Sequence, residues 1–321
     1  MKRTPRHTLL RTAAALTLLL PALTACTIVS RTVPAADEPI TFASFLPDVT
    51  KAVVESEADM TEFAVWGWHT AADATGADQT AIFDGEKVSR DGAGSPWTYD
   101  VPRFWVEGSY DFYALHPYPF TEDDGSGVTA ACTAEGITSI TLDSPNADID
   151  LMTATATRDY PSGGDGAVAF TFEHLLVKVS IVVRTEGLGT GTVSLMNLQL
   201  KGPELTATYY PQSGWSDLSK DESTLIKYND PSGVGLTDKG VTIVEDRLLI
   251  PTDQPSAYSV EINYTDGSSQ KTSTAELPSI PIWQPGESYI YTLTIKGDYI
   301  GFDRPLVDDW DDADGGIIIV D

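Results

Sequence analysis

Apolar and polar residues alternate with a period of two along much of this chain. Residues 177–183, 260–264 and 289–295 carry Val, Ile, Leu or Tyr at every second position. This period turns one set of side chains toward a core and the other toward solvent, so each stretch predicts a β-strand. Further apolar stretches predict strands at 40–46, 63–68, 110–115, 137–142, 193–200 and 248–250.

The segments between these stretches are rich in residues that favour turns. Glycine and aspartate cluster at 90–94, 123–127 and 265–267. No long stretch has the spacing of apolar residues that an amphipathic helix requires. Many short strands joined by such turns are typical of β-sandwiches, so we predict an all-β fold.

The length of 321 residues favours two domains. The best candidate boundary is the segment 161–166, Pro-Ser-Gly-Gly-Asp-Gly, which is small, polar and followed by a strong strand pattern. We therefore predict one domain over residues 27–165 and a second over residues 166–321.

The first 26 residues have the layout of a secretory signal. Four Lys and Arg residues among the first eleven precede an apolar run over residues 12–25, and Ala25 stands directly before Cys26. The run is too short to span a bilayer as a stable helix. Residues 23–26 have the form of a bacterial lipobox, which predicts that Cys26 becomes the N-terminus and carries a lipid. An ordinary signal peptide with a chance cysteine is the alternative.

The formal net charge of −27 excludes some classes of partner. Nucleic acid and anionic lipid are also negatively charged, so both would repel such a chain. The charge does not point to any particular partner. If Cys26 is lipidated, Cys132 has no second cysteine for an intrachain disulfide. Cys132 lies among small residues, which favours a buried or half-buried thiol over a nucleophile.

Motifs for catalysis are missing from the sequence. After the signal, His69, His116 and His174 are the histidines that remain, and none has a second histidine at metal-ligand spacing. There is no zinc-type cysteine pair, phosphate-binding glycine loop or nucleophile elbow. We predict a structural role for His174, and no catalytic residues, metal or cofactor. A glycosidase-type carboxylate pair stays open as an alternative, although spacing favours no particular two carboxylates.

Aromatic residues are dense in the N-terminal half of the chain. Trp66, Trp68 and Trp105 are among them, and as exposed rings they would suit a glycan-binding platform. Most of the aromatic residues fall on alternating strand positions, which favours the core instead. A surface glycan-binding protein is therefore the second alternative.

The end of the chain is an apolar tail. Ile317, Ile318, Ile319 and Val320 follow two glycines and precede only Asp321. An apolar strand at a terminus needs a cover for its edges. The tail is either the last strand of its own sheet or a strand offered to another molecule.

The order of several short motifs resembles the fimbrillin family, the pilins of Bacteroidales-type fimbriae. The motifs are the lipobox at 23–26, 40–42 leading to 50–52, 83–88, 97–99, 103–114, 150–152 leading to 172–179, 283–289 and 307–310. This resemblance implies two tandem transthyretin-like β-sandwiches and export as an outer-membrane lipoprotein that carries palmitate. It also implies a structural, non-enzymatic fimbrial subunit that assembles with other subunits at the cell surface.

The resemblance further implies assembly by strand exchange. A trypsin-like protease cuts family stalk pilins after a basic residue just past the first strand, which here places the cut between Lys51 and Ala52. The strand then lost includes Ile40, Phe42 and Phe45. The C-terminal strand of a neighbour, residues 317–320, fills the groove that opens. An exchange that runs head to tail and does not close produces a filament.

The processing position departs from the family pattern. The usual residue there is arginine, whereas this chain has Lys51. Arg31 is the alternative site, but it precedes the first strand, so a cut there would open no groove. An uncut, lipidated chain would be an anchor at the fimbrial base. Stalk subunit, anchor and tip adhesin therefore all stay open.

Overall fold

The alternating stretches of the sequence form β-strands in the structure. The computed structural model describes residues 38–45, 60–74, 78–118, 127–142, 149–164, 166–188, 192–203, 207–216, 222–267, 269–297 and 299–309. Strands dominate these residues, and a single 3-10 turn, η1 (Pro255–Ala257), begins at a proline. The predicted all-β fold is confirmed. No helix among the described residues has the length and apolar character needed to cross a membrane.

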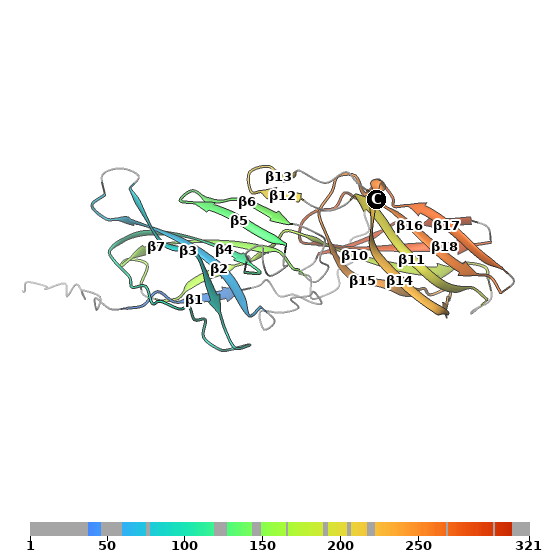
Figure 1. Cartoon of the computed structure of the whole chain (residues 1–321), viewed down its shortest axis with the longest axis horizontal. Helices are drawn as coiled ribbons and strands as arrows, with labels where there is room; N and C mark the ends of the chain where they lie inside the picture. Colours follow the sequence, from blue (N-terminus) through green and yellow to red (C-terminus); the bar gives the residue numbers. More distant parts are fainter. Residues whose placement is uncertain are drawn as a thin grey trace, which may run out of the picture. The chain divides into compact units, whose positions relative to one another are not determined.

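Three sheets carry most of the N-terminal half of the chain. The first has the order β3 (Gln79–Ser89), β2 (Glu62–Ala71), β4 (Gly108–His116), β7 (Met152–Tyr160) and β9 (Glu173–His174). The second has the order β13 (Gly214–Ser216), β12 (Ala207–Tyr210), β6 (Gly136–Leu142) and β5 (Val128–Thr133). The third pairs β1 (Phe42–Phe45) with β8 (Val168–Thr171). In Figure 1 the five-stranded sheet lies between β1 below and the β5, β6, β12 and β13 group above.

The five-stranded sheet is buried on both of its faces. One face contributes Phe63, Phe83 and Phe112 to an aromatic cluster, which also includes side chains of β1 and β8. The opposite face contributes Trp66 and Leu115 to a second cluster, together with apolar side chains of β5 and β6. Adjacent residues of a strand point to opposite faces, so both members of a pair such as Val65 and Trp66 are buried here.

Two further sheets make up the C-terminal half. One has the order β15 (Val241–Leu249), β10 (Val177–Thr185), β18 (Glu287–Lys296) and β19 (Tyr299–Phe302), and β20 (Leu306–Asp309) also pairs with β18. The other has the order β14 (Glu222–Gly235), β11 (Ser194–Pro203), β16 (Ser259–Thr265) and β17 (Gln270–Glu276). Their inward side chains share one buried cluster. β10 and β18 run parallel, whereas the other pairs in these two sheets are antiparallel.

Every stretch that the alternation predicted as a strand contains one, and several further strands were not predicted. β17, with the sequence Gln-Lys-Thr-Ser-Thr-Ala-Glu, carries almost no apolar side chain because it is an edge strand, which among the described residues pairs only with β16. For β10 the expectation of one solvent-facing side is wrong, since Lys178 and Ser180 are buried as well. Ser180 Oγ donates to Asp246 Oδ1 of β15 at 3.0 Å, and Asp246 N donates back to Ser180 Oγ at 2.9 Å.

Three pairings cross the predicted domain boundary between residues 165 and 166. β8 pairs with β1, β9 pairs with β7, and β12 pairs with β6. The division of the chain into domains over residues 27–165 and 166–321 stays a prediction.

Close packing at Gly202 in β11 gives a test of the fold. A Cβ atom at this position would lie 2.2 Å from Cδ1 of Tyr258, whose ring is buried against Trp283. We expect Gly202→Ala to lower the free energy of unfolding by about 1–3 kcal/mol in urea titrations, because the ring must shift. Gly166→Ala is the control, since a Cβ there meets no atom within 4 Å and Gly166 is exposed. Equal stability of the two variants would contradict this packing.

Candidate functional site

The segment that contains β1 is the structural feature on which the strand-exchange prediction depends. Its first residues pair antiparallel with residues 103–105: the Ile40 N–H donates to the carbonyl of Arg103 at 2.8 Å. The Trp105 N–H donates to the carbonyl of Glu38 at 3.0 Å. The hydroxyl of Tyr99 adds a third bond by donating to the carbonyl of Ile40 at 2.7 Å.

The remainder of the segment pairs with β8. The strands run parallel, with Phe42 opposite Val168 and Phe45 opposite Thr171. The Val168 N–H also donates to the carbonyl of Thr41 at 2.7 Å. Among the described residues β1 is the only strand that pairs with β8. The backbone groups of β8 therefore depend on β1 for their ladder hydrogen bonds.

The side chains of the segment alternate strictly between core and surface. Ile40, Phe42 and Ser44 are buried, whereas Thr41 is exposed and Ala43 is half-buried. This is the period-two pattern of a strand that covers a core with one face.

Phe42 lies at the centre of the aromatic cluster. Its ring stacks on Phe170 of β8 with a centroid distance of 5.8 Å and an interplanar angle of 15°. It also makes edge contacts with other rings, namely Phe83 at 5.4 Å, Tyr99 at 5.7 Å, Phe112 at 6.1 Å and Phe63 at 6.3 Å. Offset and edge-to-face arrangements of this kind add about 0.5–1.5 kcal/mol per pair beyond the burial of area.

Arg103 holds in place the segment 99–105, which pairs with the residues just before β1. Its Nε donates to the carbonyl of Ile82 at 3.0 Å, and its Nη2 lies 3.0 Å from the Glu86 carboxylate. The backbone N–H of Arg103 donates to the Tyr99 hydroxyl at 3.2 Å. Burial raises the pKa of the Tyr99 hydroxyl above its ordinary value, although Arg103 opposes the shift. Tyr99 therefore stays neutral and keeps its hydrogen bond to β1.

Withdrawal of β1 would expose both apolar and polar groups. The rings around Phe42 would lose their cover, and burial of a large side chain is worth about 1.5–3 kcal/mol. β8 would become an open strand edge, which is a template for another strand. The site, here called the β1 site, comprises residues 38–45, 99–105 and 168–171.

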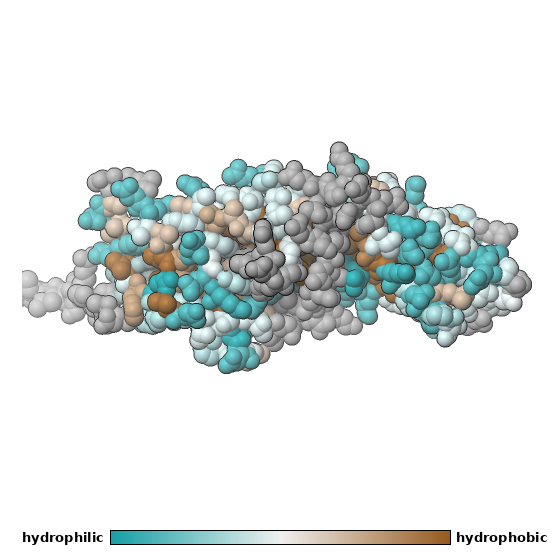
Figure 2. Space-filling model, viewed as in Figure 1, coloured by the Kyte–Doolittle hydropathy of each residue, from teal (hydrophilic) through white to brown (hydrophobic). Residues whose placement is uncertain are grey.

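Much of the surface shown in Figure 2 is hydrophilic, with small separate apolar areas.

The other predicted site residues lie outside the described residues. These are the lipidation residue Cys26, the processing residues Lys51 and Ala52, the alternative Arg31 and the donor residues Ile317, Ile318, Ile319 and Val320. The side chain of Phe45 is likewise not described. β8 was missed from the sequence, although Val168, Phe170 and Phe172 alternate there and carry the signal of a strand.

Two of the three histidines considered from the sequence, His116 and His174, are buried, whereas His69 is half-buried. His174 Nδ1 lies 2.8 Å from Asp150 Oδ1, with both side chains almost inaccessible to solvent. His116 Nδ1 lies 2.7 Å from the carbonyl of Glu62, and burial lowers the pKa of His116 below its ordinary value. Within the described ranges, no group of three His, Cys, Asp or Glu side chains could hold a metal ion.

The tryptophans do not form the platform that the glycan-binding alternative requires. Trp105 is buried in the aromatic cluster around β1, and Trp66 is buried in the cluster on the opposite face of the same sheet. Trp68 is half-buried against Tyr113, with the ring centroids 5.8 Å apart. The alternation of apolar and polar residues could not show which tryptophans are buried, because both faces of this sheet are covered.

Comparison with known proteins identifies the family. The sequence profile of the fimbrillin-like family matches residues 50–310, which include every strand from β2 to β20. The chain belongs to the fimbrillin-like family. This conclusion confirms the resemblance that the order of the motifs indicated.

Individual relatives agree with this assignment. A Bacteroides uniformis protein described as "Putative fimbrium subunit Fim1C" is 25% identical over 254 residues, which cover 76% of each chain. A solved fimbrial protein from Bacteroides vulgatus has a TM-score of 0.58 at 20% identity and covers 84% of this chain and 99% of its own. A structure from Bacteroides uniformis described as a "putative cell adhesion protein" has a TM-score of 0.51 at 19% identity, with coverages of 85% and 100%. These two structures share the fold of this fimbrillin-like chain.

Phe42 provides a direct test of the β1 site. We expect Phe42→Ala to lower the free energy of unfolding by about 3–5 kcal/mol, because the surrounding rings lose their contacts and a cavity remains. Thr41→Ala is the matched control on the outward face of the same segment, and its change should stay within about 0.5 kcal/mol. Urea unfolding followed by tryptophan fluorescence measures both. Equal effects would show that the inward face of the segment contributes no more than the outward face.

The thiol of Cys132 gives a test that bears on catalysis. Burial raises the pKa of Cys132 to about 12, so the thiolate is scarce at neutral pH. We expect iodoacetamide at pH 8 to modify Cys132 at least about 100-fold more slowly in the folded chain than in the chain unfolded by guanidinium chloride. Peptide mass spectrometry follows this residue separately from Cys26. Fast modification of the folded chain would point to an activated thiol.

Proposed function

We propose that this fimbrillin-like chain is a structural subunit of cell-surface fimbriae that joins its neighbours by β-strand exchange and catalyses no reaction. The observation that carries the proposal is the β1 site. One short strand supplies the only described ladder partner of β8, and its Phe42 ring fills a cluster of aromatic rings. A strand of similar pattern from another molecule can satisfy both requirements.

The connectivity supports proteolytic release of β1. β1 ends at Phe45 and the next strand, β2, begins at Glu62, so Lys51 lies in the connection between them. A cut between Lys51 and Ala52 would leave β1 bound only by non-covalent contacts. A cut after Arg31 would leave β1 covalently attached. The match to the family profile begins at residue 50, after β1.

The C-terminal tail has the pattern that the vacated site needs. Ile317 and Ile319 are two residues apart, as Ile40 and Phe42 are in the strand that leaves, within a run of four apolar residues. Entry of the tail would bury two large side chains, each worth about 1.5–3 kcal/mol, and would restore ladder hydrogen bonds to β8. Each subunit would then accept one strand and donate another, which produces an open filament.

Lipidation at Cys26 would hold the precursor at the outer membrane. The partners in this proposal are the lipid bilayer, a processing protease of trypsin-like specificity and other fimbrial subunits. A chain that stays uncut keeps both β1 and its lipid, so it would serve as the anchor at the fimbrial base. The role of tip adhesin is a further possibility within the same assembly.

Processing at Lys51 is tested at the N-terminus of the surface protein. We expect chains purified from fimbriae to begin at Ala52, and Lys51→Gln chains to begin at lipidated Cys26 and to stay out of the filament. Lys51→Arg is the matched control, because it keeps the positive charge that a trypsin-like protease reads. Intact-mass spectrometry measures the N-terminus. A wild-type chain that begins at Cys26 within fimbriae would assign it to the anchor and exclude the stalk role.

Donation of the tail is tested by deletion. We expect removal of residues 317–320 to abolish incorporation into fimbriae and to leave the unfolding midpoint of the monomer within about 2 °C of the full chain. Removal of Asp321 alone is the control. Electron microscopy of surface fimbriae gives the assembly readout. Normal fimbriae built from the four-residue deletion would overturn the donor role.

A further inference from the structure

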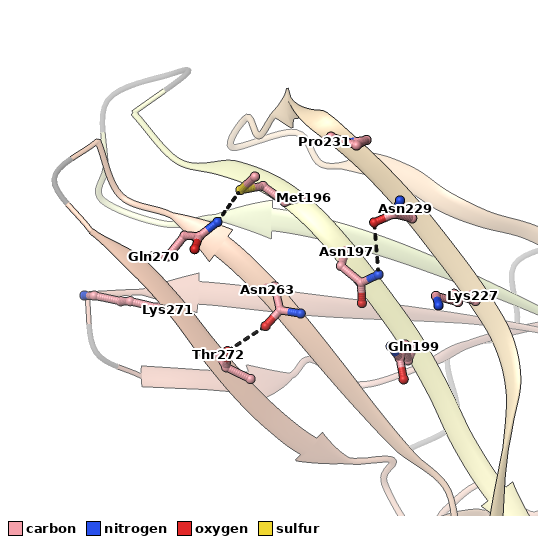
Figure 3. Close-up of a pocket in the computed structure, with 10 residues that line it drawn as sticks. All are labelled: Met196, Asn197, Gln199, Lys227, Asn229, Pro231, Asn263, Gln270, Lys271 and Thr272. Atoms are coloured by element: carbon pink, nitrogen blue, oxygen red, sulfur yellow. Dashed lines mark hydrogen bonds between the residues drawn. The ribbon is translucent and has the colours of Figure 1, made fainter.

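A row of asparagines crosses one sheet of the C-terminal half. Asn197 of β11 lies opposite Asn229 of β14 on one side and opposite Asn263 of β16 on the other. Asn263 in turn lies opposite Thr272 of β17. Figure 3 shows the side chains of this row on one face of the sheet. Four neighbouring strands therefore place amides and a hydroxyl side by side.

A β-bulge in the central strand shapes this face. The register of β11 shifts between Leu195 and Asn197 in its pairing with both β14 and β16. A bulge adds a residue and re-aims the side chains next to it. Met196 and Asn197 consequently both line a depression of about 700 Å³ over the sheet, together with Gln199 and Lys227.

The hydrogen bonds within the depression leave several groups available. Asn197 Nδ2 donates to Asn229 Oδ1 at 3.5 Å, and Asn263 Oδ1 accepts from the Thr272 hydroxyl at 2.6 Å. The amide NH₂ groups of Asn229 and Asn263 donate no hydrogen bond to a described residue. Asn197 Oδ1 is buried and has no hydrogen-bond partner among the described residues. A buried acceptor without a partner is uncommon, since it costs about 1–3 kcal/mol.

The charge of the depression is opposite to that of the chain. No carboxylate is among the residues that line it, although the chain has 47 acidic and 20 basic residues. Lys271 is neutralised by Asp266 at 2.9 Å, and the nearby Glu261 is neutralised by Lys201 at 2.9 Å. Lys227 is exposed and makes no ion pair with a described residue. One unopposed positive charge therefore stands beside the amides.

We propose that this amide face, comprising Asn197, Gln199, Lys227, Asn229 and Asn263, binds a saccharide that carries a carboxylate. The ligand carboxylate would accept from the Lys227 ammonium and the Asn229 amide as charge-assisted bonds. A sugar hydroxyl would donate to Asn197 Oδ1, and another would accept from the Asn263 amide. An acidic sugar supplies both the donor and the acceptors that the face leaves unmatched.

The proposal does not rest on strand exchange. The amide face lies on β14, β11, β16 and β17, and none of these strands pairs with β1 or β8. A subunit that failed to polymerise could still bind the saccharide, and a subunit that failed to bind the saccharide could still polymerise. The two proposals therefore succeed or fail separately.

Isothermal titration calorimetry of the purified chain tests the proposal. The probes are tetragalacturonate, its fully methyl-esterified form and 3′-sialyllactose. We expect at least one of the two acidic sugars to bind. We also expect Lys227→Gln and Asn229→Ala each to weaken that binding about ten-fold, through loss of a charge-assisted hydrogen bond. Both residues are exposed, so their substitution leaves the core intact.

A matched control separates the site from the overall charge. Lys239→Gln makes the same change of charge at an exposed residue outside the depression, and its affinity should equal that of the unsubstituted chain. If tetragalacturonate binds, its methyl ester should bind about ten-fold more weakly. Failure of both acidic sugars to bind would overturn the proposal. So would equal affinity of the ester, or equal loss in Lys239→Gln and Lys227→Gln.

Discussion

The contact between β1 and β8 is the interaction on which the rest of the N-terminal structure depends. β8 finds no other ladder partner among the described residues, and the Phe42 ring closes a cluster drawn from β2, β3, β4 and β8. A strand at the start of the chain thus completes a core whose other parts come later in the sequence. In the proposed strand exchange, the same arrangement would let a different strand complete that core, because strand pairing and ring packing need no covalent link.

The apolar interior and the acidic surface of the chain perform complementary tasks. Both faces of the sheet containing β2 and β4 are covered, so most of its aromatic rings are kept from water. The net charge of −27 favours repulsion between separate chains. Under the proposed strand exchange both properties would matter, because an open strand edge on an uncharged surface favours uncontrolled association.

Membership of the fimbrillin-like family places these features in the context of fimbriae. The β1 site suits linkage between subunits, while the amide face suits recognition of a ligand by a sheet that the linkage does not use. In the two proposals, mechanical connection and surface recognition occupy separate sheets of one chain. A change in one need not disturb the other, since no strand pairing within the described part of the chain joins the two sites.

The sequence by itself determined the fold class, because the alternation that produces a strand is a local property of a few residues. It correctly predicted strands around Phe42, Val179 and Tyr291, and the order of its motifs identified the family. Tertiary structure alone decided which strands pair and which faces are covered. The parallel pairing of β1 with β8, the burial of Trp66 and Trp105 on opposite faces of one sheet and the alignment of Asn229, Asn197 and Asn263 all join residues far apart in the chain. Their positions depend on register and on a bulge, and neither leaves a mark in local periodicity.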